Sequence, residues 1–325
     1  DVGADLRALL SEDDASISEA IAQAILHKPL CQHFGEAASH TDTRKMFEIG
    51  GYTMAKILAV CTSEKKGVQK VNVSEGLLIE NHGLQGDAHA GNWHRQVSLL
   101  SDSKIQAFNA RGANVAYGAF GENLVADLDF GSMPVGTLLR AGEALLEITQ
   151  IGKACHHGCA IFQKMGDCIM PREGVFARVL RGGTVKVGDV IEIVPRVGKR
   201  PYQAAVITLS DKGARGERED LSGPAIVERL KAAGYEIAET LLLPDGEQPL
   251  KAELMRLADQ RQIDLILTTG GTGFTARDVT PEATLAVADK LVPGIPEAMR
   301  AYSMRITPRA MLTRSVCVIR KKSLI

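Results

Sequence analysis

The residues best suited to chemistry lie in a glycine-rich stretch in the last third of the chain. Residues 264–273, DLILTTGGTG, read as an apolar strand that runs into a glycine-rich turn. Such a turn exposes consecutive backbone N–H groups, which can hold phosphate oxygens at the carboxyl end of a parallel sheet. A simple tight turn has the same composition, so the neighbouring residues must decide between the two interpretations.

The residues after this turn favour a phosphate site. Residues 277–282, RDVTPE, place a cation, a carboxylate and a helix start close to the glycines. Mg²⁺ prefers one or two carboxylates together with phosphate oxygens, so Asp278 is a candidate magnesium ligand. Asp278 also fits the role of a helix N-terminal residue that satisfies the helix dipole, and the two roles are compatible.

A second polar loop is expected at the same edge of the sheet. Residues 210–223, SDKGARGEREDLSG, follow the first strand of this region and lead into the next helix. A solvated surface loop explains this mixture of glycines and charges as well as a binding site does. The position of the loop at the sheet edge of the glycine-rich turn favours a role in binding.

A cluster of thiols lies in the middle of the chain. Cys155, Cys159 and Cys168 fall within residues 151–168, together with two adjacent histidines. Thiolate and imidazole are common zinc ligands, although a second pair of closely spaced cysteines is missing. Buried thiols that pack as small apolar groups are a simpler alternative, and one reactive thiolate that binds a soft metal or a sulfur species is a third.

The chain divides into segments that differ in composition and pattern, and these segments must position the residues described above. Residues 1–53 contain one amphipathic helix at about residues 16–26 and cannot bury a core of their own. Residues 54–195 carry short runs of Val, Ile and Leu broken by Gly, which predicts a mostly β domain, barrel-like or a sandwich. We expect one helix near residues 102–109 and a closing hairpin at residues 183–189. Residues 196–201 read as a short linker.

The last segment, residues 202–325, alternates strand and helix. We predict strands at residues 204–209, 237–243 and 265–268, and helices at residues 223–233, 249–260 and 281–288, the first of them opened by Ser222. This alternation predicts a doubly wound α/β domain with helices on both faces of a parallel sheet. The chain begins without Met and stops inside an apolar run, so we expect a piece of a longer protein and an incomplete last domain.

Composition excludes several classes of partner. The 325 residues are 45% hydrophobic and 24% charged, with a net charge of −1, so bulk attraction to nucleic acid or to an anionic membrane is not expected. No apolar run reaches the roughly 18 residues that a membrane helix needs. The first residues carry no export signal, which favours the cytoplasm. All eight histidines lie at or before His157, so the C-terminal half must work without imidazole.

The motifs of residues 202–325 together resemble the molybdopterin adenylyltransferase family: SDKG and EDLSG, LLPDGEQ, TTGGTGFTARDVTPEAT and PGIPEAMR. The resemblance implies transfer of AMP from Mg-ATP to the terminal phosphate of molybdopterin, often by a homotrimer. It assigns magnesium binding and positioning to Asp278 and Asp245. It assigns ATP and molybdopterin binding to Ser210, Asp211, Asp220, Thr269, Gly270, Gly271, Thr272, Gly273, Arg277 and Glu282. The family continues with an Asn-Leu-Pro-Gly-type loop, and this chain stops before it. A sister domain of the molybdenum-inserting enzyme is the second possibility.

The middle of the chain, about residues 55–194, resembles the MOSC domain. The resemblance rests on GLQGDAHAGNWHRQVSLL, GAFGENLV, the segment around Cys155, and MPREGVFARVLRGGTVKVGDVIEI. It implies a β-barrel-like fold that binds molybdenum, sulfur or the cofactor through one cysteine, most plausibly Cys155, and a weaker family link to pyridoxal phosphate. Asp87, His89, His94 and Arg95 would lie on the rim of the pocket, although an ordinary polar loop has the same composition.

The first 53 residues are similar to the C-terminal tail of the radical-SAM GTP cyclase, through RKMFEIGG and the helix before it. The three resemblances agree on molybdenum-cofactor biosynthesis. The sequence therefore predicts a fused cofactor-assembly protein that interacts with other enzymes of that process and adenylylates molybdopterin. The alternative is a non-catalytic carrier that binds pterin or molybdenum.

Overall fold

A computed structural model of the chain describes residues 55–153 and 160–325, and they form two compact units that divide between Arg200 and Pro201. We call residues 51–200 the barrel unit and residues 201–325 the α/β unit. The predicted segment 1–53, Cys155 and Cys159 lie outside the described residues. Across the described ranges, no helix has both the length and the apolar character needed to cross a membrane.

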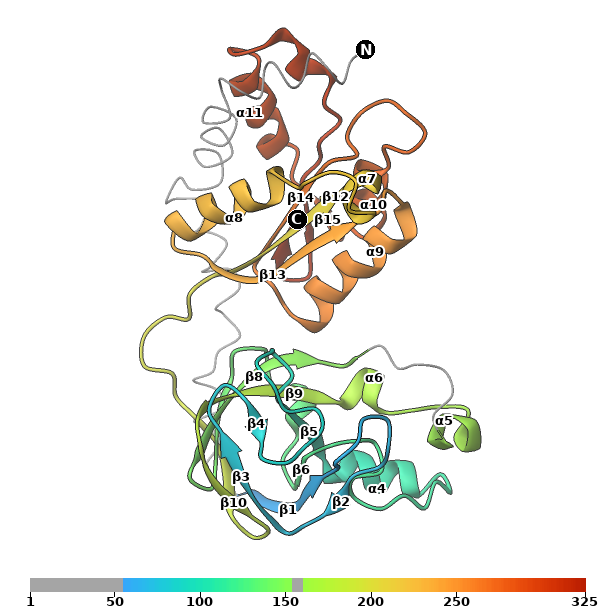
Figure 1. Ribbon diagram of the computed structural model, residues 1–325, viewed down its shortest axis with the longest axis vertical. Helices are drawn as coiled ribbons and strands as arrows, with labels where there is room; N and C mark the ends of the chain where they lie inside the picture. Colours follow the sequence, from blue (N-terminus) through green and yellow to red (C-terminus); the bar gives the residue numbers. More distant parts are fainter. Residues whose placement is uncertain (1–54, 154–159) are drawn as a thin grey trace. The chain divides into compact units, whose positions relative to one another are not determined.

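Seven strands of the barrel unit close on themselves (Figure 1). Their order around the barrel is β11 (Val190–Val194), β7 (Leu138–Ala141), β8 (Ala144–Ile151), β9 (Val175–Arg181), β5 (Val97–Ser101), β6 (Leu124–Ala126) and β1 (Ala55–Thr62). An antiparallel pairing of β1 with β11 completes the ring. This confirms the predicted barrel-like fold.

Shorter elements extend the barrel. Strand β2 (Val71–Asn72) pairs with β1, and β10 (Gly183–Lys186), β3 (Glu75–Ile79) and β4 (Gly83–Leu84) form a separate small sheet. The predicted hairpin at residues 183–189 is wrong, because β10 pairs with β3 whereas β11 pairs with β7 and β1. The helical pieces are α4 (Asp102–Asn109), η1 (Phe130–Ser132), α5 (Ala160–Met165) and α6 (Met170–Glu173).

The two core clusters on either side of β5 explain why all five of its residues are buried. Val97 and Leu99 belong to one core cluster with other strands of the barrel. Leu100 belongs to a second cluster that includes Ile105 and Phe108 of α4. Because successive side chains of a strand point to opposite faces, a strand covered on both faces loses the usual alternation. Helix α4 therefore covers the outer face of β5.

The α/β unit contains one six-stranded sheet (Figure 1). The order is β13 (Glu236–Leu243), β12 (Gln203–Leu209), β14 (Leu265–Thr269), β17 (Ser323–Leu324), β16 (Val318–Arg320) and β15 (Lys290–Leu291). The first four strands are parallel, and β16 and β15 add antiparallel pairings at one edge. The helical elements are α7 (Asp211–Ala214), α8 (Ser222–Ala232), α9 (Glu247–Met255), the π-helical turn η2 (Arg256–Gln260), α10 (Thr280–Ala286), α11 (Gly294–Ser303) and η3 (Pro308–Leu312).

Alternating residues of β12 pack against opposite helical layers. Ala205, Ile207 and Leu209 join a core cluster with residues of α9, η2 and α10. Ala204 and Val206 join another cluster with Leu230 of α8. The strand is thus buried on both faces, as parallel strands usually are. This confirms the predicted doubly wound α/β architecture.

The two helices beside the predicted site begin at or next to the predicted residues, but their first N–H groups are held differently from the expectation. Helix α8 begins at Ser222, and Asp220 Oδ1 accepts hydrogen bonds from the N–H groups of Ser222 at 3.1 Å and Gly223 at 3.0 Å. Helix α10 begins at Thr280 without a side-chain cap. Asp278 therefore does not cap α10 by a hydrogen bond, although it lies close to the N-terminus of that helix.

Candidate functional site

Three loops meet at the carboxyl ends of β12, β13 and β14. The loops after β12 and β13 are tied by a reciprocal pair of hydrogen bonds. The N–H of Asp211 donates to Asp245 Oδ2 at 3.2 Å, and the N–H of Asp245 donates to Asp211 Oδ1 at 3.1 Å. The loop after β14 joins them through Arg277, which forms an ion pair with Asp211 and donates to the Asp245 carbonyl at 3.3 Å. The structure thus brings three of the predicted site residues together.

The turn after β14 has a backbone that only glycine fits. Gly270 and Gly271 have φ angles of 95° and 66°, in the left-handed region that side chains disfavour. A Cβ atom on Gly270 would lie 2.3 Å from the Leu209 carbonyl oxygen, and one on Gly271 would lie 2.4 Å from Thr280 Oγ1. The chain therefore passes too close to β12 and α10 for any larger residue. We call residues 270–278 the glycine loop.

The carbonyl groups of four successive residues in this loop face the protein. Thr280 donates from Oγ1 to the Gly270 carbonyl at 2.9 Å and from N to the Gly271 carbonyl at 3.1 Å. Arg314 donates from N to the Thr272 carbonyl at 3.3 Å and from Nε to the Gly273 carbonyl at 2.7 Å. Sequence reasoning missed both residues as parts of the site. Thr280 lies inside the predicted motif, residues 277–282, whereas nothing in the local sequence marks Arg314.

Asp278 holds the far end of the glycine loop. Its Oδ2 accepts hydrogen bonds from Thr275 Oγ1 at 2.6 Å and Thr275 N at 2.9 Å. These bonds, the N–H of Gly273 and the charge of Arg314 hold the pKa of Asp278 below its usual range. The carboxylate is therefore ionised at neutral pH. A carboxylate offers about four lone-pair sites, so its bonds to Thr275 leave capacity for a further ligand.

The remaining predicted residues of the α/β unit lie around these loops. Ser210 Oγ accepts from Gly213 N at 3.1 Å and so caps α7. Burial alone would raise the pKa of Asp220, but hydrogen bonds led by the N–H of Gly223 hold it below its usual value. Thr269 is the last residue of β14. Glu282 forms an ion pair with Arg314, whose hydrogen bond and charge lower the pKa of Glu282.

A cavity of about 110 Å³ adjoins the glycine loop. Thr272, Thr280 and Ser315 contribute hydroxyl groups to its lining, and apolar residues such as Ile295 and Met299 form most of the rest. Cys317 also lines it, and burial raises the pKa of that thiol to about 11, so the sulfur is protonated at neutral pH. The volume is well below the roughly 300–1,000 Å³ of a typical ligand pocket, so only part of a ligand fits here.

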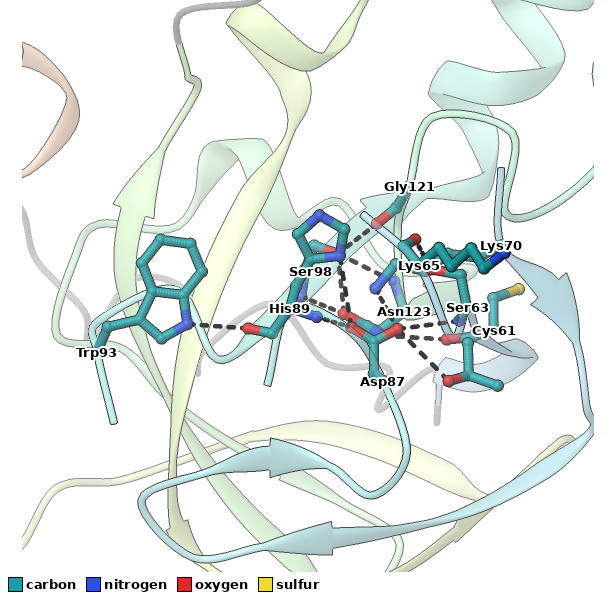
Figure 2. Close-up of polar contacts among 11 residues, drawn as sticks. Cys61, Ser63, Lys65, Lys70, Asp87, His89, Trp93, Ser98, Gly121 and Asn123 are labelled. Atoms are coloured by element: carbon teal, nitrogen blue, oxygen red, sulfur yellow. Dashed lines mark hydrogen bonds and ion pairs between the residues drawn. The ribbon is translucent and has the colours of Figure 1, made fainter. Parts of the chain in front are cut away.

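The barrel unit holds a buried ion pair next to the predicted MOSC pocket. Lys70 Nζ lies 2.7 Å from Asp87 Oδ2, and both side chains are buried (Figure 2). Asp87 also accepts hydrogen bonds from the N–H groups of Ser63 at 3.2 Å and His89 at 3.0 Å. Burial lowers the pKa of Lys70, and although burial alone would raise the pKa of Asp87, the bond to Lys70 holds it below its usual value. The bond to Lys70 therefore keeps Asp87 ionised.

The same aspartate lies under the imidazole of His89. His89 Nδ1 is 3.6 Å from Asp87 Oδ1, and burial lowers the pKa of His89, so the ring is neutral at neutral pH. Trp93 Nε1 donates to the His89 carbonyl at 3.0 Å (Figure 2). The Arg95 guanidinium lies 4.7 Å from the centre of the Trp93 ring. His89, Trp93 and Arg95 are thus linked through Trp93 at one place on the barrel.

The thiols of the described residues do not form a metal site. Cys61 and Cys168 are buried and are not joined in a disulfide, and burial raises the pKa of Cys61 to about 12. No group of three or more metal-ligating side chains occurs in residues 55–153 and 160–325. Because Cys155 and Cys159 lie outside the described residues, the choice between zinc binding, a reactive thiolate and buried thiols stays a prediction.

Comparison with known families defines the class of both units. Residues 86–192 match the MOSC domain, and residues 205–325 match the family described as a probable molybdopterin binding domain. The protein is thus a MOSC domain joined to a molybdopterin-binding α/β domain. A solved structure of the molybdopterin biosynthesis enzyme MoaB from Thermus thermophilus is 45% identical, with a TM-score of 0.37, covering 38% of this chain and 78% of that one.

Relatives place the α/β unit more narrowly. It is 42% identical over 129 residues to molybdopterin adenylyltransferase of Helicobacter pylori (strain J99), covering 37% of this chain and 69% of the relative. Molybdopterin adenylyltransferase of Escherichia coli is 45% identical over 123 residues, and the match spans 63% of its length and 37% of this chain. The chain belongs to the molybdopterin adenylyltransferase family.

Proposed function

We propose that the α/β unit transfers AMP from ATP to the terminal phosphate of molybdopterin, as a step of molybdenum-cofactor biosynthesis. The observation that carries the proposal is the glycine loop itself. Its carbonyl groups are bonded to the protein at the edge where Asp211, Asp245 and Arg277 meet. Backbone N–H groups in such a loop are suited to phosphate oxygens. The name of the relatives, molybdopterin adenylyltransferase, supports molybdopterin as the acceptor of an adenylyl group, and ATP is the donor that we propose.

The reaction needs placement and charge neutralisation more than an acid or base. An oxygen of the pterin phosphate attacks the α-phosphorus of ATP, and the bond from that phosphorus to the β-phosphate oxygen breaks. The products are adenylylated molybdopterin, joined through a phosphoanhydride, and pyrophosphate. Both reactants are anions, so the protein must bring them together against their repulsion. The α/β unit contains no histidine, and this chemistry requires none.

The carboxylates present suit a magnesium ion that arrives with the nucleotide. Mg²⁺ in nucleotide sites is usually held by one or two carboxylates plus phosphate oxygens. Asp278 and Asp245 supply such carboxylates from two of the converging loops, while the described residues lack a cluster of three or more ligands. When bound, Mg²⁺ would neutralise the phosphates. Arg277, whose side chain is 64% exposed, contributes positive charge at the same edge.

The barrel unit has a separate proposed role. We propose that it binds molybdenum, a sulfur species or the cofactor through His89 and Arg95, with Cys155 as the thiol that the sequence predicts. The buried Lys70–Asp87 pair fixes the backbone of His89, because Asp87 Oδ1 accepts a hydrogen bond from the His89 N–H. We place the protein in the cytoplasm, passing its product to other cofactor enzymes, and propose a homotrimer through the α/β unit.

The test is a direct assay of both reaction products. Purified protein is mixed with molybdopterin, Mg²⁺ and ATP, and adenylylated pterin and pyrophosphate are measured together. We expect the two to appear in equal amounts. Binding of molybdopterin without release of pyrophosphate would instead support a non-catalytic carrier.

A further inference from the structure

The direction of the carbonyl groups in the glycine loop fixes the direction of its N–H groups. Thr280 and Arg314 together bind the four carbonyl oxygens from Gly270 to Gly273. In a trans peptide the N–H points opposite to the C=O of the same peptide group. The N–H groups of Gly271 and Thr272 therefore point away from Thr280. The N–H groups of Gly273 and Thr275 bond to the Asp278 carboxylate, so Gly271 and Thr272 supply the donors that the loop can present to a ligand.

Arg314 holds this loop at more places than any local contact does. Its Nε donates to the Gly273 carbonyl, and another guanidinium nitrogen donates to the Asp278 carbonyl. A third nitrogen pairs with Glu282 in the first turn of α10. The side chain therefore connects the glycines, the far end of the loop and the following helix. The planar fork of an arginine suits three acceptors that lie apart, because its donors are spread over three nitrogens, whereas a lysine has all its donors on one nitrogen.

The contacts of Arg314 also argue against direct binding of an anionic ligand by its guanidinium. Its guanidinium is bonded to two carbonyls and one carboxylate, so its charge is already balanced within the protein. Arg277, by contrast, pairs with Asp211 and has a side chain that is 64% exposed. Arg277 is therefore the better candidate for contact with an anionic ligand, and Arg314 acts on the loop.

We propose that Arg314 is a positioning residue that fixes the glycine loop so that the N–H groups of Gly271 and Thr272 face the phosphates of ATP. It acts through the loop and does not touch the nucleotide. This inference rests on the proposed function for the identity of the ligand, and it adds a residue to which neither the sequence motifs nor the family matches assign a role.

The test compares two arginines with the same kind of contacts. Arg320 donates to Asp259 and to the Val287 carbonyl, so it also bridges a carboxylate and a carbonyl, but away from the glycine loop. Arg314→Lys and Arg320→Lys are each made in the full chain. Mg-ATP binding is measured by calorimetry below the unfolding temperature, and amide hydrogen exchange of residues 271–275 is measured without ligand.

We expect Arg314→Lys to raise the Kd for Mg-ATP about tenfold or more, because charge-assisted hydrogen bonds that fix the loop are lost. Exchange of the loop amides should become faster in the same variant. Arg320→Lys should lower the unfolding temperature and leave both the Kd and the loop exchange at wild-type values. Molybdopterin binding should stay unchanged in both variants.

Two outcomes overturn the inference: a wild-type Kd and wild-type loop exchange in folded Arg314→Lys, or equal losses in Arg320→Lys. The proposed function has its own failure. Wild-type protein that binds ATP but transfers no AMP would remove the adenylyltransferase proposal, while a tenfold difference between the two lysine variants would still support the role of Arg314. Wild-type protein that binds no ATP would overturn both.

Discussion

At Asp278, a substitution by asparagine can remove the negative charge of the side chain while keeping its shape. Its carboxylate accepts two hydrogen bonds from Thr275 and lies at the end of the glycine loop, and it does not cap α10. An asparagine oxygen can accept the same bonds but carries no charge. The role in holding the loop and the role in holding Mg²⁺ therefore predict different results for one substitution.

We expect Asp278→Asn to lower AMP transfer by roughly 10³-fold or more, because the charge stabilisation of a metal ion is worth several kcal/mol. Molybdopterin binding should change little. The measurement is a single-turnover assay of AMP transfer, with Asp259→Asn as a control that removes a carboxylate from the ion pair with Arg320. Retention of most activity in Asp278→Asn would remove Asp278 from the mechanism and leave it as a loop residue.

In the barrel unit, Lys70 and Asp87 form a buried ion pair whose contribution to stability can be measured. Both side chains are buried, and Asp87 supports the backbone N–H groups of Ser63 and His89. We expect Lys70→Met to lower the free energy of unfolding by about 3–5 kcal/mol, because it leaves Asp87 charged and unpaired in the interior. Lys70→Met combined with Asp87→Asn should recover part of that loss in urea unfolding. A single variant as stable as wild type would show that solvent or another group balances Asp87.

At the scale of elements, the turn before β6 depends on one buried carboxylate. Glu122 accepts hydrogen bonds from the N–H groups of Gly118 at 2.6 Å and Phe120 at 3.0 Å. Burial raises the pKa of Glu122 from 4.5 to about 7. Folding therefore takes up a proton between these two values. Stability from this group is fully present below pH 4.5 and is lost as the pH rises through about 7.

The consequence is a pH dependence that a neutral residue should remove. The two pKa values differ by about 2.5, which corresponds to at most about 3 kcal/mol of unfolding free energy. We expect Glu122→Gln to flatten the fall in stability between pH 4.5 and 7, measured by urea unfolding at several pH values. Other titrating groups, such as His89, are common to both proteins and cancel in the difference. Parallel curves for the two proteins would contradict the raised pKa.

Elements defined by local pattern were predictable, and those defined by distant partners were not. The helix at residues 102–109 and the strand at residues 265–268 follow from local composition, and the structure has both. The expected hairpin at residues 183–189 failed because β10 finds its partner in β3, more than a hundred residues earlier in the chain. Turn residues signal a change of direction but do not say which strand comes alongside.

The candidate site likewise contains residues that were predictable from local sequence and one that was not. Asp245 and the glycines closely follow strands, and Asp278 stands at the end of the same glycine-rich stretch. Loops at the carboxyl ends of parallel strands meet at one edge of the sheet. Their convergence was therefore predictable from the strand pattern. Arg314 lies 41 residues after Gly273 and reaches the glycine loop from the segment before β16. Only the tertiary fold brings it there.

For the whole molecule, the two units have separate cores. Leu99 lies in the core of the barrel, and Leu254 lies in the core beneath α9. Because each unit buries its own apolar residues, we expect two unfolding transitions in scanning calorimetry. Leu99→Ala and Leu254→Ala should each lower one transition, with a loss of about 2–5 kcal/mol in the unit that carries it. One shared transition that moves with either substitution would show that the units unfold together.

The closure of the barrel has a consequence for how such a protein can be assembled from parts. Its first strand, β1, pairs with its last strand, β11, and Ala55 lies opposite Ile191. The polypeptide therefore enters and leaves the barrel at neighbouring points. A unit with adjoining ends can be inserted between other segments, or circularly permuted, without pulling its strands apart. The strand pairing that closes the barrel thus also brings its two ends together, so the barrel can be fused to another domain at either end.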